Sequence, residues 1–108
     1  MKFGVFMAPF HRVGENPTLA RDRNLELIEW LDTLGYDEAY IGEPHSAGWE
    51  TISSPEIFIA AAGRTRKIRL GTGVISLPYH HPYMVASRMV LLDHLTKGRV
   101  ILGVGRAH

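Results

Sequence analysis

The stretch of residues 68–82, IRLGTGVISLPYHHP, combines an apolar run, two glycines and a pair of histidines. The apolar run is typical of a buried parallel strand, and Gly71 and Gly73 leave its backbone bare where the strand emerges. Glycine within a strand often marks the close approach of another backbone or of a ligand. Parallel α/β folds bind ligands at the carboxyl ends of their strands. The stretch therefore predicts a substrate or cofactor site beside its polar, histidine-bearing turn.

The histidines of the chain do not form a metal-binding pattern. The chain has six histidines and no cysteine, so thiolate ligands and disulfides are excluded. His11, His80 and His94 show no metal-like spacing on one face and no evident carboxylate partner, so we expect no metal site. His81 precedes Pro82 and is expected to cap the helix that begins there.

The composition is that of an ordinary globular domain. The 108 residues are 45% hydrophobic and 21% charged, with a net charge of +1, and this balance does not favour a nucleic-acid partner. The basic cluster at residues 64–69 is interpreted as a solvated connection between a helix and a strand. The first residues lack the length of a signal peptide and no apolar run is long enough for a membrane span, so we expect a cytoplasmic protein.

Strand and helix signals alternate along the chain. Asn16 and Pro17 are typical of a helix start, and Gly35 is typical of the residue that follows a helix. Ser53 and Glu56 fit a capping box for a second helix. The expected strands are residues 3–8, 39–42, 68–75 and 100–104, and the expected helices are 17–34, 55–63 and 82–95. The expected apolar helix faces are Leu27, Ile28, Leu31 and Leu34 in the first helix, and Met84, Val85, Met89, Leu92 and Leu95 in the third.

This alternation predicts an α/β fold of parallel strands joined by right-handed helical crossovers. Either a doubly wound sheet or part of a (β/α)8 barrel fits the pattern. No Gly-x-Gly-x-x-Gly motif follows the first strand, and Gly103-x-Gly105 after the fourth lacks the third glycine, so a dinucleotide-binding fold loses its main support. The first and last strands and one sheet face are expected to be uncovered, which favours pairing of two copies into a homo-oligomer.

Three groups of motifs resemble the bacterial luciferase-like, flavin-dependent monooxygenases, in particular their limonene or alkanal monooxygenase-like branch. They occur in order and at the separations typical of that family. They are residues 40–45 (YIGEPH); residues 54–62 (SPEIFIAAA) with 64–65 and 69–73 (RLGTG); and residues 81–82 with 91–95 (LLDHL) and 97–105 (KGRVILGVG).

The resemblance implies that residues 1–108 are a single N-terminal part, the first half, of a (β/α)8 TIM barrel. It implies that FMN, reduced by a flavin reductase, reacts with O2 and oxygenates a small apolar aldehyde, ketone or alkene. A deazaflavin-dependent hydride transfer of the same superfamily is the alternative, and a non-catalytic, flavin-binding or self-associating fragment is a third. The isolated chain is expected to have little activity.

The resemblance also implies roles for residues at the end of the second strand. Glu43 is interpreted either as a polar contact of the flavin or as a structural hydrogen-bond partner of a neighbouring strand. The family's catalytic base corresponds to Pro44, which cannot accept a proton. His45 is therefore the candidate catalytic residue, because imidazole donates and accepts protons near neutral pH.

Further cofactor contacts follow from the same resemblance. Gly73-Val74 corresponds to a non-proline cis peptide bond over which the flavin ring lies, and Ser76 is expected to offer its hydroxyl or a backbone group to the ring. Arg106 corresponds to an arginine that binds the flavin phosphate, for which a guanidinium is well suited.

Overall fold

Parallel strands and helices alternate in the computed structural model, which describes residues 1–8, 12, 14–45 and 54–106. The first half of the chain forms β1 (Gly4–Met7), α1 (Pro17–Leu34), β2 (Glu38–Ile41) and α2 (Pro55–Ala61). The second half forms β3 (Arg69–Thr72), β4 (Ile75–Ser76), the 3-10 helix η1 (Leu77–Tyr79), α3 (Pro82–Leu95), β5 (Val100–Ile101) and β6 (Val104–Gly105).

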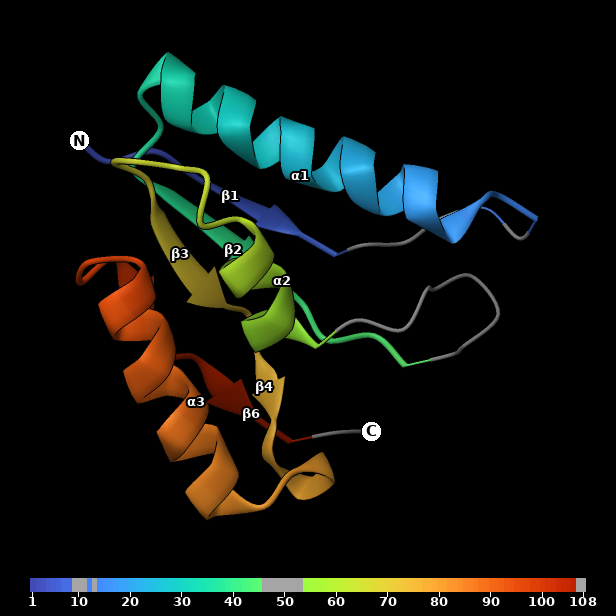
Figure 1. Ribbon diagram of the computed structural model, residues 1–108, viewed down its shortest axis with the longest axis vertical. Helices are drawn as coiled ribbons and strands as arrows, with labels where there is room; N and C mark the ends of the chain where they lie inside the picture. Colours follow the sequence, from blue (N-terminus) through green and yellow to red (C-terminus); the bar gives the residue numbers. More distant parts are fainter. Residues whose placement is uncertain (9–11, 13, 46–53, 107–108) are drawn as a thin grey trace.

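The main sheet has the strand order β1-β2-β3-β5, and every pair in it is parallel (Figure 1). In register, Phe6 lies beside Tyr40, Tyr40 beside Gly71, and Gly71 beside Ile101. A helix connects each strand of this sheet to the next. The expected parallel α/β fold is therefore confirmed, and all four strands direct their carboxyl ends to the same edge.

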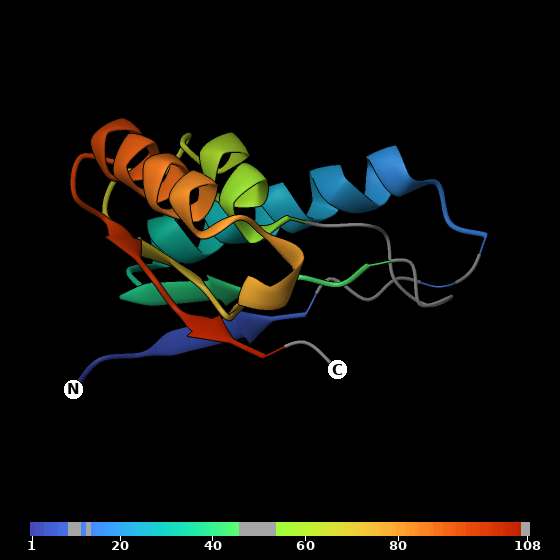
Figure 2. The same cartoon turned by 90° about the horizontal axis from the view of Figure 1, so that it is seen from below.

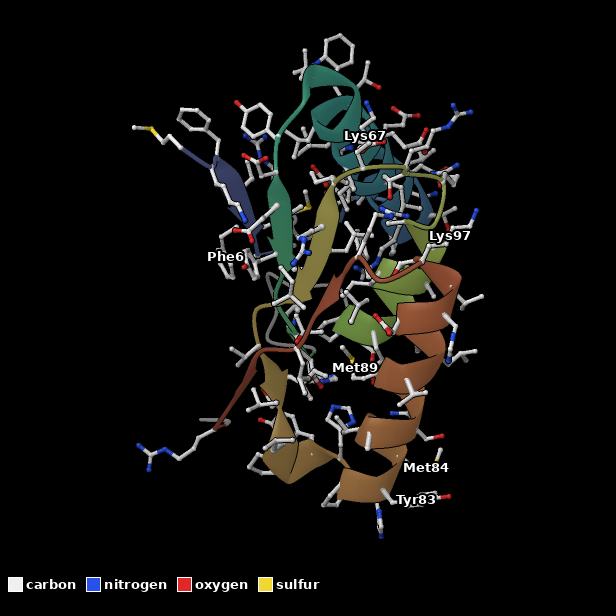
Figure 3. The ribbon with its side chains drawn as sticks, turned by 90° about the vertical axis from the view of Figure 1, so that its left-hand side faces the viewer. Phe6, Lys67, Tyr83, Met84, Met89 and Lys97 are labelled. Carbon is white, nitrogen blue, oxygen red and sulfur yellow. The ribbon has the colours of Figure 1, made fainter. Side chains whose placement is uncertain are left out.

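In the described residues, α1, α2 and α3 cover the same face of the main sheet (Figure 2). The core lies between these two layers and includes Ile28, Ile41, Leu70 and Met89. Figure 3 shows Met89 pointing from α3 toward the sheet, whereas Phe6 lies on the opposite face. The ring of Phe6 is 63% exposed, so the face without helices presents apolar side chains to solvent.

The helices bury narrower apolar faces than the sequence predicts. Ile28 and Leu31 of α1 are buried, as are Val85, Met89 and Leu92 of α3. The remaining expected core residues are exposed in this chain, namely Leu27, Leu34, Met84 and Leu95. Only side chains that point at the sheet are buried, because the described residues place no further helix beside the outer flanks of α1 and α3.

Two expected strands are each broken into two. The expected strand 68–75 is divided into β3 and β4 at the peptide bond between Gly73 and Val74, which is cis. The amide of Gly73 still donates to Ile41 O of β2 at 2.8 Å, but the amide of Ile75 donates to Gly103 O at 2.9 Å. The pairing with β2 thus ends at this bond, whereas the segment that holds β5 and β6 lies beside the chain on both sides of it, and β4 pairs with β6 in a separate two-stranded sheet.

The expected strand 100–104 is divided into β5 and β6, and the hydroxyl of Thr72 binds the backbone between them. It donates to Gly103 O at 2.7 Å and accepts from Gly103 N at 2.8 Å. In the stretch of chain between β5 and β6, a side chain therefore makes the hydrogen bonds that backbone groups make in the neighbouring strands. The backbone approaches so closely here that a Cβ on Gly103 would lie 2.2 Å from Thr72 O.

The cap residues predicted for α1 are confirmed, whereas the capping box predicted for α2 is not. Asn16 caps α1 by accepting from the amides of Thr18 and Leu19, and Gly35 follows the helix with φ 87°. The capping box predicted for α2 is wrong at its acidic residue: Ser54 is the N-cap, and the buried Glu56 pairs with Arg88 of α3 at 3.0 Å. Ser53 lies outside the described residues.

Asp32 joins the end of α1 to the loop before β3. Its carboxylate accepts from the backbone amides of Arg66, Lys67 and Ile68 at 2.8–2.9 Å. Burial alone would raise the pKa of Asp32, but these three hydrogen bonds and the positive charge of Arg99 outweigh it, and the pKa is lowered. The segment that leads into β3 is therefore held by an ionised carboxylate.

We predict that Gly103→Ala lowers the free energy of unfolding by about 2 kcal/mol, because the added Cβ meets a backbone oxygen that cannot move independently. Urea unfolding measures this change. Gly4→Ala is the matched control: its Cβ would lie 3.4 Å from the nearest atoms, an ordinary contact, so a change within about 0.5 kcal/mol is expected. Equal effects of the two substitutions would contradict the close approach at Gly103.

We predict that the stability advantage of the wild type over Asp32→Asn disappears in acid. The pKa of Asp32 is lower in the folded state than its ordinary value, so the unfolded chain takes up the proton first as the pH falls. The advantage should be complete above the ordinary aspartate pKa of about 4 and should be lost as the pH falls through the folded value. Urea unfolding over a series of pH values measures it, and a constant advantage would contradict the prediction.

Candidate active site

Two segments meet at the carboxyl edge of the sheet. Glu43 follows β2 by two residues, and Ser76 is the last residue of β4. The amide of Ser76 donates to Glu43 Oε1 at 2.9 Å. Parallel pairing of β2 with β3 brings these segments to the same edge although 33 residues separate them in the sequence.

The other carboxylate oxygen of Glu43 contacts two histidines. His45 Nε2 lies 2.5 Å and His80 Nε2 lies 2.7 Å from Glu43 Oε2. The Glu43 side chain is 0% exposed. Burial alone would raise the pKa of the Glu43 carboxyl, but hydrogen bonds from His45, Ser76 N and His80, with the charge on His80, outweigh it and lower the pKa. Glu43 is therefore an ionised, buried acceptor.

The two histidines differ in exposure. The side chain of His45 is 36% exposed, whereas that of His80 is 13% exposed. The His45 ring also meets the ring of Tyr79 edge-on, with centroids 5.3 Å apart and an interplanar angle of 88°. His45 is thus held by a carboxylate and by an aromatic ring, and it is the member of the cluster more accessible to a ligand.

The structure brings together three of the residues predicted from sequence, namely Glu43, His45 and Ser76. The hydrogen bond from Ser76 confirms the structural interpretation of Glu43, whereas its contact with a flavin stays a prediction. The expectation that His80 has no carboxylate partner is wrong, because its ring contacts Glu43. Its position in the turn after the third expected strand was the available signal, because that turn emerges at the edge where Glu43 lies.

The glycines of the third strand have different roles from one another. At Gly71 a Cβ would lie 2.5 Å from the Tyr40 ring, so the missing side chain accommodates an aromatic group of the neighbouring strand. At Gly73 the expected cis peptide bond to Val74 is confirmed. A Cβ on Gly73 would lie 3.2 Å from the Phe6 ring, so Phe6 lies directly beside this bond.

The remaining predicted residues lie near the same edge. Gly105 pairs with Ser76 in register, so Arg106 follows directly after the partner of Ser76, and its side chain is exposed. His81 caps α3 by accepting from the amide of Tyr83 at 3.1 Å, as predicted. The expectation that Arg106 binds a phosphate stays a prediction.

Residues 1–8, 12, 14–45 and 54–106 are the described part of the chain. Within them, no group of three or more histidine and acidic side chains has an arrangement that could hold a metal ion. In the same described ranges, no helix has the length and apolar character needed to cross a membrane. His11 lies outside the described residues.

The edge also offers an apolar surface next to the polar cluster. Val74 packs against Gly103 and Gly105, and both Val74 and Phe6 are exposed. A buried carboxylate shared by two imidazoles, with exposed apolar side chains near it, lies at the carboxyl edge of a parallel α/β sheet, the edge at which proteins of the β/α-barrel class bind their ligands.

Comparison with known proteins assigns the family. The family described as luciferase-like monooxygenase matches residues 1–108, and the chain belongs to it. The chain is 68% identical over 106 residues to 4-hydroxyprotoasukamycin monooxygenase of Streptomyces nodosus subsp. asukaensis, which covers 97% of the chain and 29% of that protein. It is 56% identical over 104 residues to limonene 1,2-monooxygenase of Rhodococcus erythropolis, covering 95% and 27%.

Solved structures share the fold of the chain. The oxygenating constituent of 3,6-diketocamphane monooxygenase from Pseudomonas putida, a type II Baeyer-Villiger monooxygenase in complex with FMN, superimposes with a TM-score of 0.93 at 31% identity, covering 100% of the chain and 30% of its own. The coenzyme F420-dependent tetrahydromethanopterin reductase of Methanopyrus kandleri superimposes with a TM-score of 0.78 at 27% identity, covering 99% and 27%. The chain thus spans less than a third of the length of each of these proteins.

We predict that Glu43→Leu destabilises the fold by about 3 kcal/mol, because it leaves the amide of Ser76 and the ring of His80 without their acceptor in a nearly closed site. Glu43→Gln is the matched variant: it preserves the shape of the side chain and an acceptor for Ser76 N. It should cost about 1 kcal/mol. Urea unfolding of the two variants measures the difference, and equal stability would contradict the role of Glu43 as a buried acceptor.

Proposed function

We propose that this chain contributes the cluster of Glu43, His45 and His80 to a flavin-dependent monooxygenase. The enzyme uses reduced FMN and O2 to oxygenate a small apolar aldehyde, ketone or alkene. The observation that carries the proposal is the buried carboxylate shared by two imidazoles beside the exposed Phe6 and Val74. Such a surface suits a flat aromatic ring system, and the cluster provides proton exchange at its border.

The relatives support the oxygenation reaction. Those that are 68% and 56% identical are named as monooxygenases, and the P. putida structure contains FMN. When bound, the reduced flavin would supply the electrons that activate O2. Substrate and cofactor would both reach the site from the carboxyl edge, where His45 is exposed.

The residues of this chain would divide the remaining tasks. His45 would exchange a proton with the reacting groups, in place of the family base that Pro44 cannot replace. The backbone at Gly73 and Val74 would support the flavin ring, with the Ser76 hydroxyl beside it. Arg106 would bind the phosphate, as paired N–H groups of a guanidinium can do.

A deazaflavin-dependent hydride transfer is the second candidate. The similarity to the F420-dependent reductase of M. kandleri supports it, but that similarity, at 27% identity, is weaker than the similarity to the monooxygenases. Partnership with a flavin reductase, a cytoplasmic location and a homo-oligomeric state complete the proposal. The isolated chain would turn over little, because β1 and β5 are the open edges of its sheet rather than parts of a closed barrel.

We predict that a chimera in which this chain replaces the matching segment of R. erythropolis limonene 1,2-monooxygenase oxygenates limonene with reduced FMN and O2. The 56% identity over that segment makes the exchange feasible. His45→Leu in the chimera should lower product formation by about 100-fold or more, because it removes the proton-exchanging group. Gas chromatography with mass spectrometry measures the product.

His94→Leu is the control in this chimera, since His94 is exposed on α3 and takes no part in the cluster. Unchanged product formation in His45→Leu would contradict the proposed catalytic role. Oxidation of reduced F420 without oxygen uptake would favour the second candidate. Robust turnover by the isolated 108-residue chain would refute the expectation that it is nearly inactive.

A further inference from the structure

In the cluster of Glu43, His45 and His80, two imidazoles share one carboxylate oxygen. His45 Nε2 and His80 Nε2 lie 2.5 Å and 2.7 Å from the same oxygen, Glu43 Oε2. An ionised carboxylate accepts hydrogen bonds and cannot donate them. Each contact is therefore a hydrogen bond only if the imidazole nitrogen that faces Glu43 carries the proton.

The orientation of the carboxylate is set independently of the histidines. The backbone amide of Ser76 donates to Oε1 at 2.9 Å, and this amide belongs to β4, which pairs with β6. The sheet thus directs Oε2 toward both rings. The lowered pKa of Glu43 keeps the group ionised over the range in which an enzyme of this kind works.

We infer that Glu43 selects the Nε2–H tautomer of both histidines, so that His45 meets the active site with Nδ1 as its proton-accepting atom. Because Nε2 is held by Glu43, Nδ1 is the nitrogen left for a ligand. Glu43 is then a positioning residue that acts through His45, as the carboxylate partner of a catalytic histidine does in a hydrolase triad. The catalytic use of Nδ1 rests on the proposed function, whereas the tautomer assignment does not.

The turn after β4 supports the same geometry. His80 follows η1, and its backbone amide donates to Leu77 O at 3.0 Å, while Tyr79 of η1 contacts the ring of His45. His80 is therefore the less exposed histidine, fixed by its own turn, and occupies the second acceptor position of Glu43 Oε2. His45 remains the one member of the pair that is open enough to exchange protons with a substrate.

Glu43→Gln offers an inversion test. Ser76 N requires an acceptor, so the amide oxygen of the glutamine takes the position of Oε1 and its NH2 group takes the position of Oε2. That NH2 group carries two N–H donors and faces both rings. Both hydrogen bonds can persist only if Nε2 of each histidine is unprotonated, so each histidine should change to the Nδ1–H tautomer.

Long-range 15N–1H correlation spectra of the 15N-labelled chain identify the tautomers at about pH 8, where a free imidazole is neutral. The wild type should show Nε2–H at His45 and His80, and Glu43→Gln should show Nδ1–H at both. His80→Leu should leave His45 as Nε2–H, because Glu43 stays ionised. His94→Leu is the matched control and should change neither.

An Nδ1–H tautomer of His45 in the wild type would overturn the inference, and so would an unchanged tautomer in Glu43→Gln. In the limonene monooxygenase chimera, Glu43→Gln should lower turnover by about 100-fold or more, because Nδ1 of His45 then donates instead of accepting. Full turnover despite an inverted tautomer would overturn the catalytic use of Nδ1. An inactive wild-type chimera would count against the proposed function alone, since the spectra are recorded on the chain itself.

Discussion

The site depends on the hydrogen bonds that the buried carboxylate of Glu43 accepts. A buried charge is costly unless hydrogen bonds replace the lost water. Here three N–H groups do so, one from the backbone of Ser76 and two from imidazoles. The same hydrogen bonds that compensate for burial also fix the orientation of two rings, so the stability of the edge and the arrangement of its imidazoles have one physical origin.

The second constraint is the break at the peptide bond between Gly73 and Val74. Before it, the chain pairs with both β2 and β5; after it, the chain pairs with β6, which follows β5 along the same segment. Parallel pairing of β2 with β3 brings Ser76 to the edge where Glu43 lies, and Phe6 of β1 lies beside Gly73. Thr72 makes the matching break on the other strand possible, because its hydroxyl both donates to and accepts from the backbone of Gly103.

Family membership and the local geometry together limit the chemistry. The resemblance to the family places its catalytic base at Pro44, which has no titratable group, and the next residue, His45, is held by a buried carboxylate. Under the proposed function, His45 would supply at this edge the imidazole that Pro44 cannot. Helices on only one face of the sheet leave the aromatic and aliphatic side chains of the other face, Phe6 among them, available to a flat ligand or to further strands.

The sequence by itself determined the order of the elements, their parallel pairing, the helix ends at Asn16, Gly35 and His81, and the histidine and carboxylate at the end of β2. Capping and hydrophobic periodicity are local, so they can be detected within a few neighbouring residues. Only the tertiary structure decided that the third and fourth expected strands break, that the Tyr40 ring fills the space at Gly71, and that His80 shares Glu43 with His45. Glu43 and His80 are 37 residues apart, and such contacts depend on strand register and on the direction of a turn, which no local pattern specifies.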